Sequence, residues 1–112
     1  MAHDWIKDFP GEILVCDTDG VILEMNALAI RNRESVGGAS LVDSNMLNCH
    51  SKATRPRITS MLEEAKQNIY TIERNGIHKL IYQTPWYSNG QYAGFVEFIL
   101  DIPAEMPHFI RG

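Results

Sequence analysis

The sequence predicts an α+β fold in which an antiparallel sheet carries helices on one of its faces. Two stretches near the ends of the 112-residue chain each have the pattern strand, tight turn, strand. The turn is Thr18-Asp19-Gly20 in the first stretch, residues 13–26, and Asn89-Gly90 in the second, residues 85–98. Glycine supplies the positive φ that a tight hairpin turn needs. Because helical patterns separate the two hairpins, we expect a small curved sheet that holds helices in its hollow.

Composition restricts the class of protein. The hydrophobic fraction of 45% argues against a disordered chain, and no apolar run reaches the roughly 18 residues of a membrane span. The first eight residues lack the basic start and apolar centre of a signal peptide, so we expect a cytoplasmic protein. A net charge of −4 argues against nucleic-acid binding. Two cysteines are too few for a disulfide framework, and we expect both as thiols.

The N-terminal part contains a short helix and the first hairpin. Trp5, Ile6 and Phe9 lie close together in an amphipathic segment over residues 1–10, which Pro10-Gly11 ends. Strands are then expected at 13–17 and 21–25, followed by a helix over 27–33 with Asn26 as its N-cap. Gly37-Gly38 breaks that helix, and short helical turns follow up to residue 51.

A longer helix follows, with Pro56 in its first turn. Its apolar residues fall at i, i+3, i+4, i+7 and i+11, which is one face of a 3.6-residue period: Ile58, Met61, Leu62, Ala65 and Ile69.

The C-terminal part is β-rich. Asn75-Gly76 joins strands expected at 70–74 and 77–83, and the last strand runs over 91–101. Alternation on that last strand puts Phe95 and Ile99 on one face and Phe98 on the other. We expect Phe98 to point inward and the other two to point outward.

The order of elements resembles that of a PAS sensory domain over residues 12–102. The residues that carry this resemblance are Asp17-Thr18-Asp19-Gly20-Val21-Ile22, Asn26-Ala27, Pro85, Asn89-Gly90, Gly94-Phe95-Val96 and Asp101-Ile102. The resemblance implies one domain over 1–112 with a five-stranded antiparallel sheet and helices on its inner face. Residues 1–10 then form an N-terminal helix and 103–112 a tail. Pro103 and Pro107 oppose a helical continuation, which leaves either a stand-alone module or a fragment of a larger sensor.

The same resemblance implies a small-molecule site between the sheet and the long helix. The candidate ligand-binding residues are Met46, His50, Met61, Leu62, Tyr82, Trp86 and Phe98. They offer aromatic and apolar walls with a few polar tips, which suits a small apolar or aromatic ligand. Core packing also explains these side chains.

The family also pairs through the outer face of its sheet, so we expect a homodimer and a signalling protein as partner. The candidate interface residues are Trp5, Ile6, Phe9, Phe95 and Ile99. The hypothesis is therefore a sensory module that binds a ligand and dimerises to pass a signal on. The alternative is a ligand-free platform for dimerisation and protein interaction.

Cofactor chemistry has weak support in the sequence. His50 is a candidate haem ligand, although it precedes the long helix, and a capping role also explains it. Asn48-Cys49-His50 resembles only the start of the flavin-binding LOV signature, because Arg-Phe-Leu-Gln does not follow the cysteine. Adjacent cysteine and histidine do not suit one zinc ion. No Ser-His-Asp set or phosphate loop is present, so we expect neither a metal site nor an enzyme.

Overall fold

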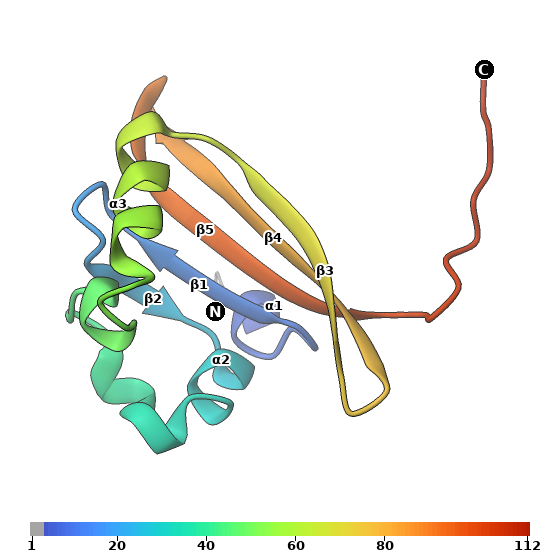
Figure 1. The fold of residues 1–112 in the computed structure, drawn as a ribbon, viewed down its shortest axis with the longest axis horizontal. Coiled ribbons are helices and arrows are strands. Elements are labelled where there is room, and N and C mark those ends of the chain that lie inside the picture. The colour runs from blue at the N-terminus through green and yellow to red at the C-terminus, as the bar shows by residue number, and fades with distance from the viewer. Residues whose placement is uncertain (1–3) are drawn as a thin grey trace.

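The computed structural model describes residues 4–112 apart from the side chain of Cys49, and a five-stranded antiparallel sheet forms its body (Figure 1). The strand order is β2-β1-β5-β4-β3. The strands are β1 (Glu12–Cys16), β2 (Ile22–Met25), β3 (Asn68–Arg74), β4 (Ile77–Ser88) and β5 (Gln91–Ile102). The predicted α+β fold is confirmed. β1 pairs with β5 through the register Val15 to Val96, which joins the first hairpin to the last one in a single layer.

Helices lie on both sides of this layer. They are α1 (Asp4–Lys7), α2 (Ala27–Arg31) and α3 (Arg55–Glu64), with 3-10 turns η1 (Glu34–Val36), η2 (Gly38–Leu41) and η3 (Met46–Cys49). In Figure 1, α3 crosses the inner face of the sheet, while α1 lies behind β1 and β5 on the outer face. None of the helices in the described part of the chain is long and apolar enough to cross a membrane.

The long helix α3 ends earlier than its apolar pattern predicts. Ala65 has φ +49° and ψ +47°, a left-handed conformation that terminates the helix after Glu64. Ile69 therefore lies on β3, opposite Tyr82 of β4, and its side chain is 47% exposed. The prediction that Ile69 belongs to the buried helical face is wrong. Pairing of β3 with β4 begins at Asn68 and takes this segment from the helix.

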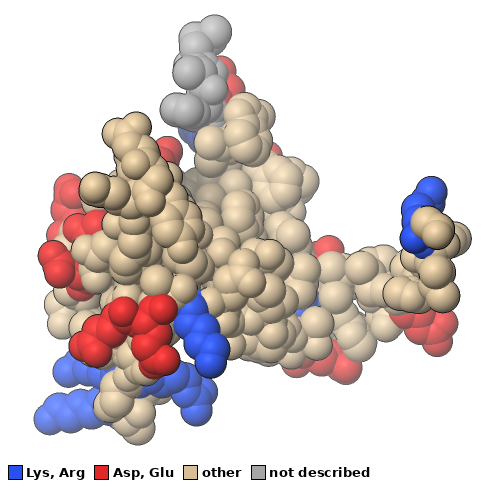
Figure 2. Space-filling model, turned by 90° about the horizontal axis from the view of Figure 1, so that it is seen from above, with Lys and Arg blue, Asp and Glu red and all other residues tan. Residues whose placement is uncertain are grey.

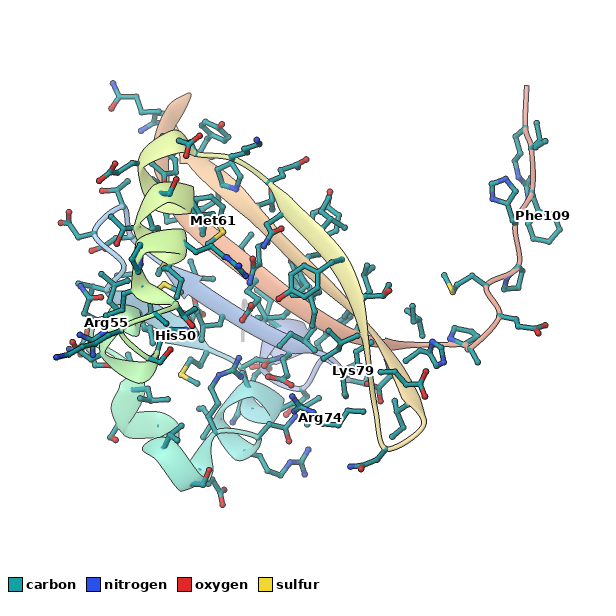
Figure 3. The ribbon with its side chains drawn as sticks, in the orientation of Figure 1. His50, Arg55, Met61, Arg74, Lys79 and Phe109 are labelled. Carbon is teal, nitrogen blue, oxygen red and sulfur yellow. The ribbon has the colours of Figure 1, made fainter. Side chains whose placement is uncertain are left out.

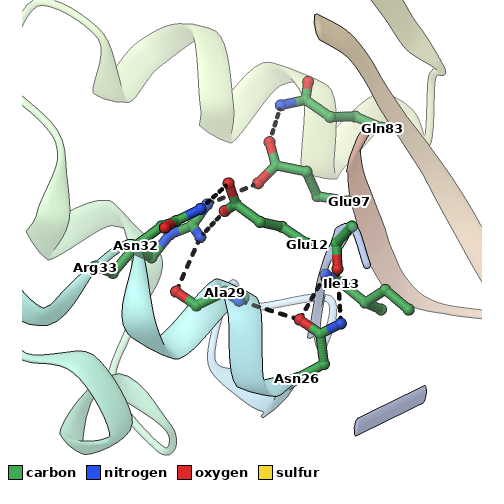
Figure 4. A network of polar contacts seen from close by, with 9 residues as sticks. Glu12, Ile13, Asn26, Ala29, Asn32, Arg33, Gln83 and Glu97 are labelled. Carbon is green, nitrogen blue, oxygen red and sulfur yellow. Dashed lines mark hydrogen bonds and ion pairs between the residues drawn. The ribbon is translucent and has the colours of Figure 1, made fainter. Parts of the chain in front are cut away.

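The predicted N-cap Asn26 is confirmed, and it does more than cap α2. Its side-chain oxygen accepts hydrogen bonds from the backbone N–H groups of Ala29 (3.1 Å) and Ile13 (3.0 Å). Its amide nitrogen donates to the carbonyls of Gly11 (2.8 Å) and Ile6 (3.1 Å). Asn26 is 3% exposed, so one buried amide joins α1, β1 and α2. Figure 4 shows its contacts with Ile13 and Ala29.

The two faces of β5 are opposite to those predicted. Phe95 is 3% exposed and packs against Cys16, Ile58 and Leu62, on the same side of the sheet as α3. Ile99 also points inward, whereas Phe98 lies on the outer face. Both faces of β5 are apolar, so alternation fixes which residues share a face but not which face is inner.

The core divides into two adjoining clusters of buried residues on the inner side of the sheet. One contains Leu14, Ile22, Met25, Ala29 and Leu41, and the other contains Cys16, Ile58, Leu62 and Phe95. The first fixes α2 and η2 on β1 and β2. The second fixes α3 at the end of the sheet where β1 meets β5.

Residues 103–112 have no regular secondary structure and extend away from the sheet (Figure 1). Figure 2 shows this tail standing clear of the body of the domain, whose visible face carries acidic and basic residues side by side. Three apolar side chains of the tail are exposed, at 57%, 71% and 93%: Met106, Phe109 and Ile110.

Candidate ligand cavity

A cavity of about 720 Å³ lies between α3 and the inner face of the sheet. Its apolar lining comes from the sheet, from α3 and from the turns before α3: Leu14, Ile22, Val36, Leu41, Met46, Ile58, Met61, Ile81 and Ile99. Small-molecule sites in proteins typically have about 300–1,000 Å³ and a mainly apolar wall with a few polar groups. The cavity therefore has the size and character of such a site.

The cavity exists because α3 is anchored at only one end of the sheet. Ile58 and Leu62 pack on Cys16 and Phe95, and the hydroxyl of Tyr92 donates a 2.7 Å hydrogen bond to the carbonyl of Leu62. These contacts lie at the β1 and β5 side. The edge strand β3 pairs only with β4, and the space between it and α3 is left open.

A network of charged side chains crosses the sheet beneath the cavity (Figure 4). Arg33, just after α2, contacts Glu12 of β1 and lies 3.3 Å from Oε1 of Glu97 on β5. Gln83 of β4 donates a 2.6 Å hydrogen bond to the other oxygen of Glu97, and Asn32 donates to Glu12 at 3.0 Å. One guanidinium thus contacts two carboxylates. We call Glu12, Asn32, Arg33, Gln83 and Glu97 the polar floor of the cavity, and its formal charge is −1. Glu97, Gln83 and Arg33 all line the cavity.

Further polar groups line the cavity from β3 and from the start of α3. Asn68 donates a 3.0 Å hydrogen bond to Gln83, and Tyr70 lies next to it on the inner face of β3. Burial raises the pKa of Tyr70, the charge of Glu97 raises it further, and Arg57 lowers it. The phenol therefore stays neutral at physiological pH and can donate a hydrogen bond into the cavity.

The sequence-predicted ligand residues divide between the two faces. Met46, His50 and Met61 line the cavity, and Figure 3 shows Met61 on the side of α3 that faces the strands. His50 is exposed at the entrance to α3. Leu62 is buried in the core cluster beside the cavity.

The three aromatic candidates do not belong to this cavity. Tyr82 pairs directly with Phe98, and both lie on the outer face, opposite to Ile81 and Ile99. Trp86 follows in the same alternation, and its indole nitrogen donates a 3.0 Å hydrogen bond to the carbonyl of Cys16. The expectation that Tyr82, Trp86 and Phe98 form an inner aromatic wall is wrong. It followed from assigning the inner face to Phe98.

The outer face carries a second, smaller hollow of about 180 Å³. Trp5 and Ile6 of α1 line it together with Ile13, Val15, Glu24, Asn26, Val96 and Phe98. Trp5 remains 67% exposed, while Ile6 and Phe9 are half-buried. Three of the predicted interface residues, Trp5, Ile6 and Phe9, thus belong to the segment on this face. The other two, Phe95 and Ile99, lie on the inner face and cannot contact a partner there.

Apart from His50, the polar residues that line the cavity were missed by sequence reasoning. Glu97 had a usable signal, because it is the one charged residue between Gln91 and Asp101 on a strand that is otherwise mostly apolar. A charge in such a position requires a buried partner. Arg33, Gln83 and Arg57 had no comparable signal, since polar residues at those spacings are common on helix and strand surfaces.

No three His, Cys, Asp or Glu side chains among the described residues are grouped so that they could hold a metal ion. The thiol of Cys16 is enclosed at 1% exposure, and burial raises its pKa.

No protein-family model matches the sequence, and no curated protein matches it. Solved structures do match the fold. The PAS domain of BvgS from Bordetella pertussis superposes with a TM-score of 0.65 at 17% identity, over 91% of this chain and 84% of that one. The PAS domain of an HTR-like protein from Haloarcula marismortui gives 0.63 at 14% identity, over 90% and 94%. A sensory-box sensor histidine kinase from Vibrio cholerae gives 0.64 at 12% identity, over 91% and 89%. With its strand order, its crossing helix and these superpositions, the chain has the fold of a PAS domain.

Proposed function

We propose that this domain is a sensory module that binds a small molecule in the cavity between α3 and the sheet. The observation that carries the proposal is the 720 Å³ cavity, with its mainly apolar wall and a polar floor from which Arg33, Glu97 and Gln83 line it. The similar domains of the Vibrio cholerae kinase and BvgS support a sensory role.

The proposed signal is a shift in how α3 and α2 pack on the sheet. A ligand in the cavity touches Met61 on α3 and Glu97 on β5 at the same time. Glu97 also contacts Arg33, which follows α2. A ligand that binds one arrangement of these elements more tightly raises the population of that arrangement. The size of the shift is set by the difference between its affinities for the two arrangements.

A pair of tryptophan variants at neighbouring positions tests ligand binding. Ile99→Trp places a large ring in the cavity, whereas Phe98→Trp enlarges a side chain on the outer face of the same strand. A thermal-shift screen of metabolites should find compounds that stabilise the wild type and Phe98→Trp but not Ile99→Trp. Compounds that stabilise all three proteins equally would place binding elsewhere, and a screen that yields none would count against the proposal.

We further propose that the domain dimerises through the outer face. This face carries Val96, Phe98 and Tyr82, and α1 leaves Trp5 67% exposed beside them. Light-scattering mass at rising concentration should show a dimer that Trp5→Ser weakens. Val36→Ser is the control, because Val36 is also exposed but lies on the cavity side. Equal dimerisation in both variants would move the interface away from α1.

The alternative function is a ligand-free interaction platform, and the exposed apolar residues of the tail and the outer face favour it. If Met61→Ala alters only stability while no ligand is found, the platform explains the domain. Haem binding through His50 is a separate outcome, which a Soret band in the absorbance spectrum of haem-supplemented protein would reveal.

A further inference from the structure

One cation of the cavity lining, Arg57, has no counter-charge among the residues that the structure describes. Arg57 is exposed on the first turn of α3, lines the cavity, and makes no side-chain hydrogen bond or ion pair with any residue that the structure describes. Arg33, the other arginine of the lining, contacts both Glu12 and Glu97. A guanidinium presents five N–H donors in a planar fork that matches a carboxylate. Arg57 is thus the group of the cavity best prepared for an anion.

Two more donors belong to the same mouth of the cavity. His50 and Thr54 precede Arg57 in the segment that enters α3, and both line the cavity. Thr54 shares a 3.0 Å hydrogen bond with Ser51, which fixes its hydroxyl near the start of the helix. An imidazole N–H and a hydroxyl can each donate to an oxygen atom that Arg57 holds.

The opposite polar group of the cavity is an acceptor. Glu97 receives hydrogen bonds from Arg33 and Gln83, one on each oxygen, and a carboxylate can accept about four. Glu97 therefore retains capacity for a hydroxyl or amine of a ligand. The opposed effects of Glu97 and Arg57 on Tyr70 show that its phenol is within electrostatic reach of both groups.

The wall between these polar groups is apolar. Ile58 and Met61 face it from α3, and Ile81 and Ile99 face it from the sheet. Met46 adds a second thioether. Thioethers make favourable contacts with aromatic rings, at about 0.3–1.5 kcal/mol each. A flat ring between α3 and the sheet would bury its faces against this wall.

We propose that the ligand is a small aromatic carboxylic acid that carries a hydrogen-bond donor at its far end. Its carboxylate binds Arg57, its ring packs between Met61 and Ile99, and its donor reaches Glu97. A single negative charge fits better than the double charge of a phosphate. Arg57 is the one unpaired arginine of the lining among the described residues, and the polar floor already has one carboxylate in excess. This inference rests on the proposed sensory function and specifies the chemistry of its ligand.

Matched acids and amides test this chemistry. The probes are para-hydroxyphenylacetate, para-hydroxyphenylpropionate and para-hydroxyphenylbutyrate, each with its primary amide, and titration calorimetry gives their dissociation constants. The three spacer lengths cover the unknown separation of the two polar ends. At least one acid should bind about tenfold more tightly than its amide, since a charged pair in a cavity contributes roughly that difference.

The protein variants are Arg57→Gln and Lys66→Gln, which remove the same charge. Lys66 follows α3, is exposed and does not line the cavity. Arg57→Gln should weaken the acid about tenfold and leave the amide within about twofold, while Lys66→Gln should change neither. Thermal denaturation of both variants checks that they fold.

The outcomes separate this inference from the proposed function. Amides that bind as well as acids, or an acid that binds Arg57→Gln as tightly as the wild type, would overturn the carboxylate assignment. A neutral compound that Ile99→Trp excludes would do the same while supporting the sensory function. If neither the probes nor the wider metabolite screen yields a ligand, both proposals fail.

Discussion

Arg33 and Glu97 are joined by an ion pair in which Nη2 lies 3.3 Å from Oε1, beneath the cavity. The same guanidinium contacts Glu12, whose side chain is only 11% exposed. The pair connects the end of α2 to the middle of β5, two elements that the proposed ligand would touch or displace. The same side chains would therefore serve both stability and the proposed signalling.

Removal of Arg33 should cost substantial stability. Arg33→Gln leaves Glu12 and Glu97 close to each other without a counter-charge. Breaking a buried ion pair costs about 3–5 kcal/mol, and the partial exposure of these side chains reduces the expected loss to about 2 kcal/mol. Urea unfolding measures the change. Arg31→Gln, on the exposed side of α2, is the matched control and should stay within about 0.5 kcal/mol. Equal losses in the two variants would show that the network does not stabilise the fold.

Asn26 should be among the most sensitive positions of the chain. Asn26→Ala leaves the N–H groups of Ile13 and Ala29 and the carbonyls of Gly11 and Ile6 without their partner. Because buried unpaired groups cost about 1–3 kcal/mol each before relaxation, we expect a loss of about 3 kcal/mol.

Asn32→Ala provides the comparison, since it removes a single hydrogen bond to Glu12 and should cost about 1 kcal/mol. Denaturant unfolding of both variants measures the two losses in free energy of unfolding. A smaller loss for Asn26→Ala than for Asn32→Ala would contradict the central role of that amide.

Gly94 allows β1 and β5 to approach each other. A Cβ at this position would lie 1.9 Å from the carbonyl oxygen of Cys16, the same oxygen that accepts from Trp86. Gly94→Ala should therefore destabilise the protein by about 3 kcal/mol. Gly90→Ala is the control. Gly90 has a positive φ of +78°, like Gly94 with +140°, but nothing lies within 4 Å of an added Cβ. Only backbone strain of about 1 kcal/mol is therefore expected from this substitution. Similar melting temperatures for the two variants would argue against the close approach.

The thiol of Cys16 should be inert in the folded protein. Burial raises its pKa above the ordinary value of 9.0, and a backbone hydrogen bond from Phe95 opposes this only in part. Iodoacetamide at pH 8 should alkylate Cys16 on the order of 100-fold more slowly than in urea, with each cysteine followed by its own peptide in mass spectra. Rapid labelling of native Cys16 would mean that this end of the core opens easily.

The same shift has a consequence for stability against pH. A thiol whose pKa is raised by folding stabilises the folded state fully below the unfolded pKa. That stability is lost as the pH rises, because the unfolded thiol ionises first. The free energy of unfolding should fall above pH 9, and Cys16→Ala should reduce the slope.

The sequence predicted the order of elements because turns and caps are local signals. Asn75-Gly76 and Asn89-Gly90 occupy the positive-φ turns expected of them, and Asn26 caps α2. These residues determine their conformation through their own side chains or their freedom at φ. The joining of the terminal hairpins then followed from the resemblance to a known family.

The inner face of the sheet could not be predicted in the same way. Phe98 and Ile99 are adjacent and both apolar, and a period of two gives no sign of which one meets α3. The choice is made by long-range packing, such as that of Phe95 on Cys16 and Leu62. For the same reason only part of the cavity lining was predicted. Met46, His50 and Met61 were predicted correctly, whereas Glu97 and Ile99 were missed and aromatic residues of the outer face were predicted instead.

Native mass spectrometry of the purified protein tests the central claim most directly. The account predicts that the native mass of the wild type exceeds the denatured mass by a retained small molecule. Phe98→Trp should keep this excess, and Ile99→Trp should lose it. An excess that persists in Ile99→Trp, or a wild type that retains nothing from cell extract, would contradict the assignment of the cavity as a ligand site.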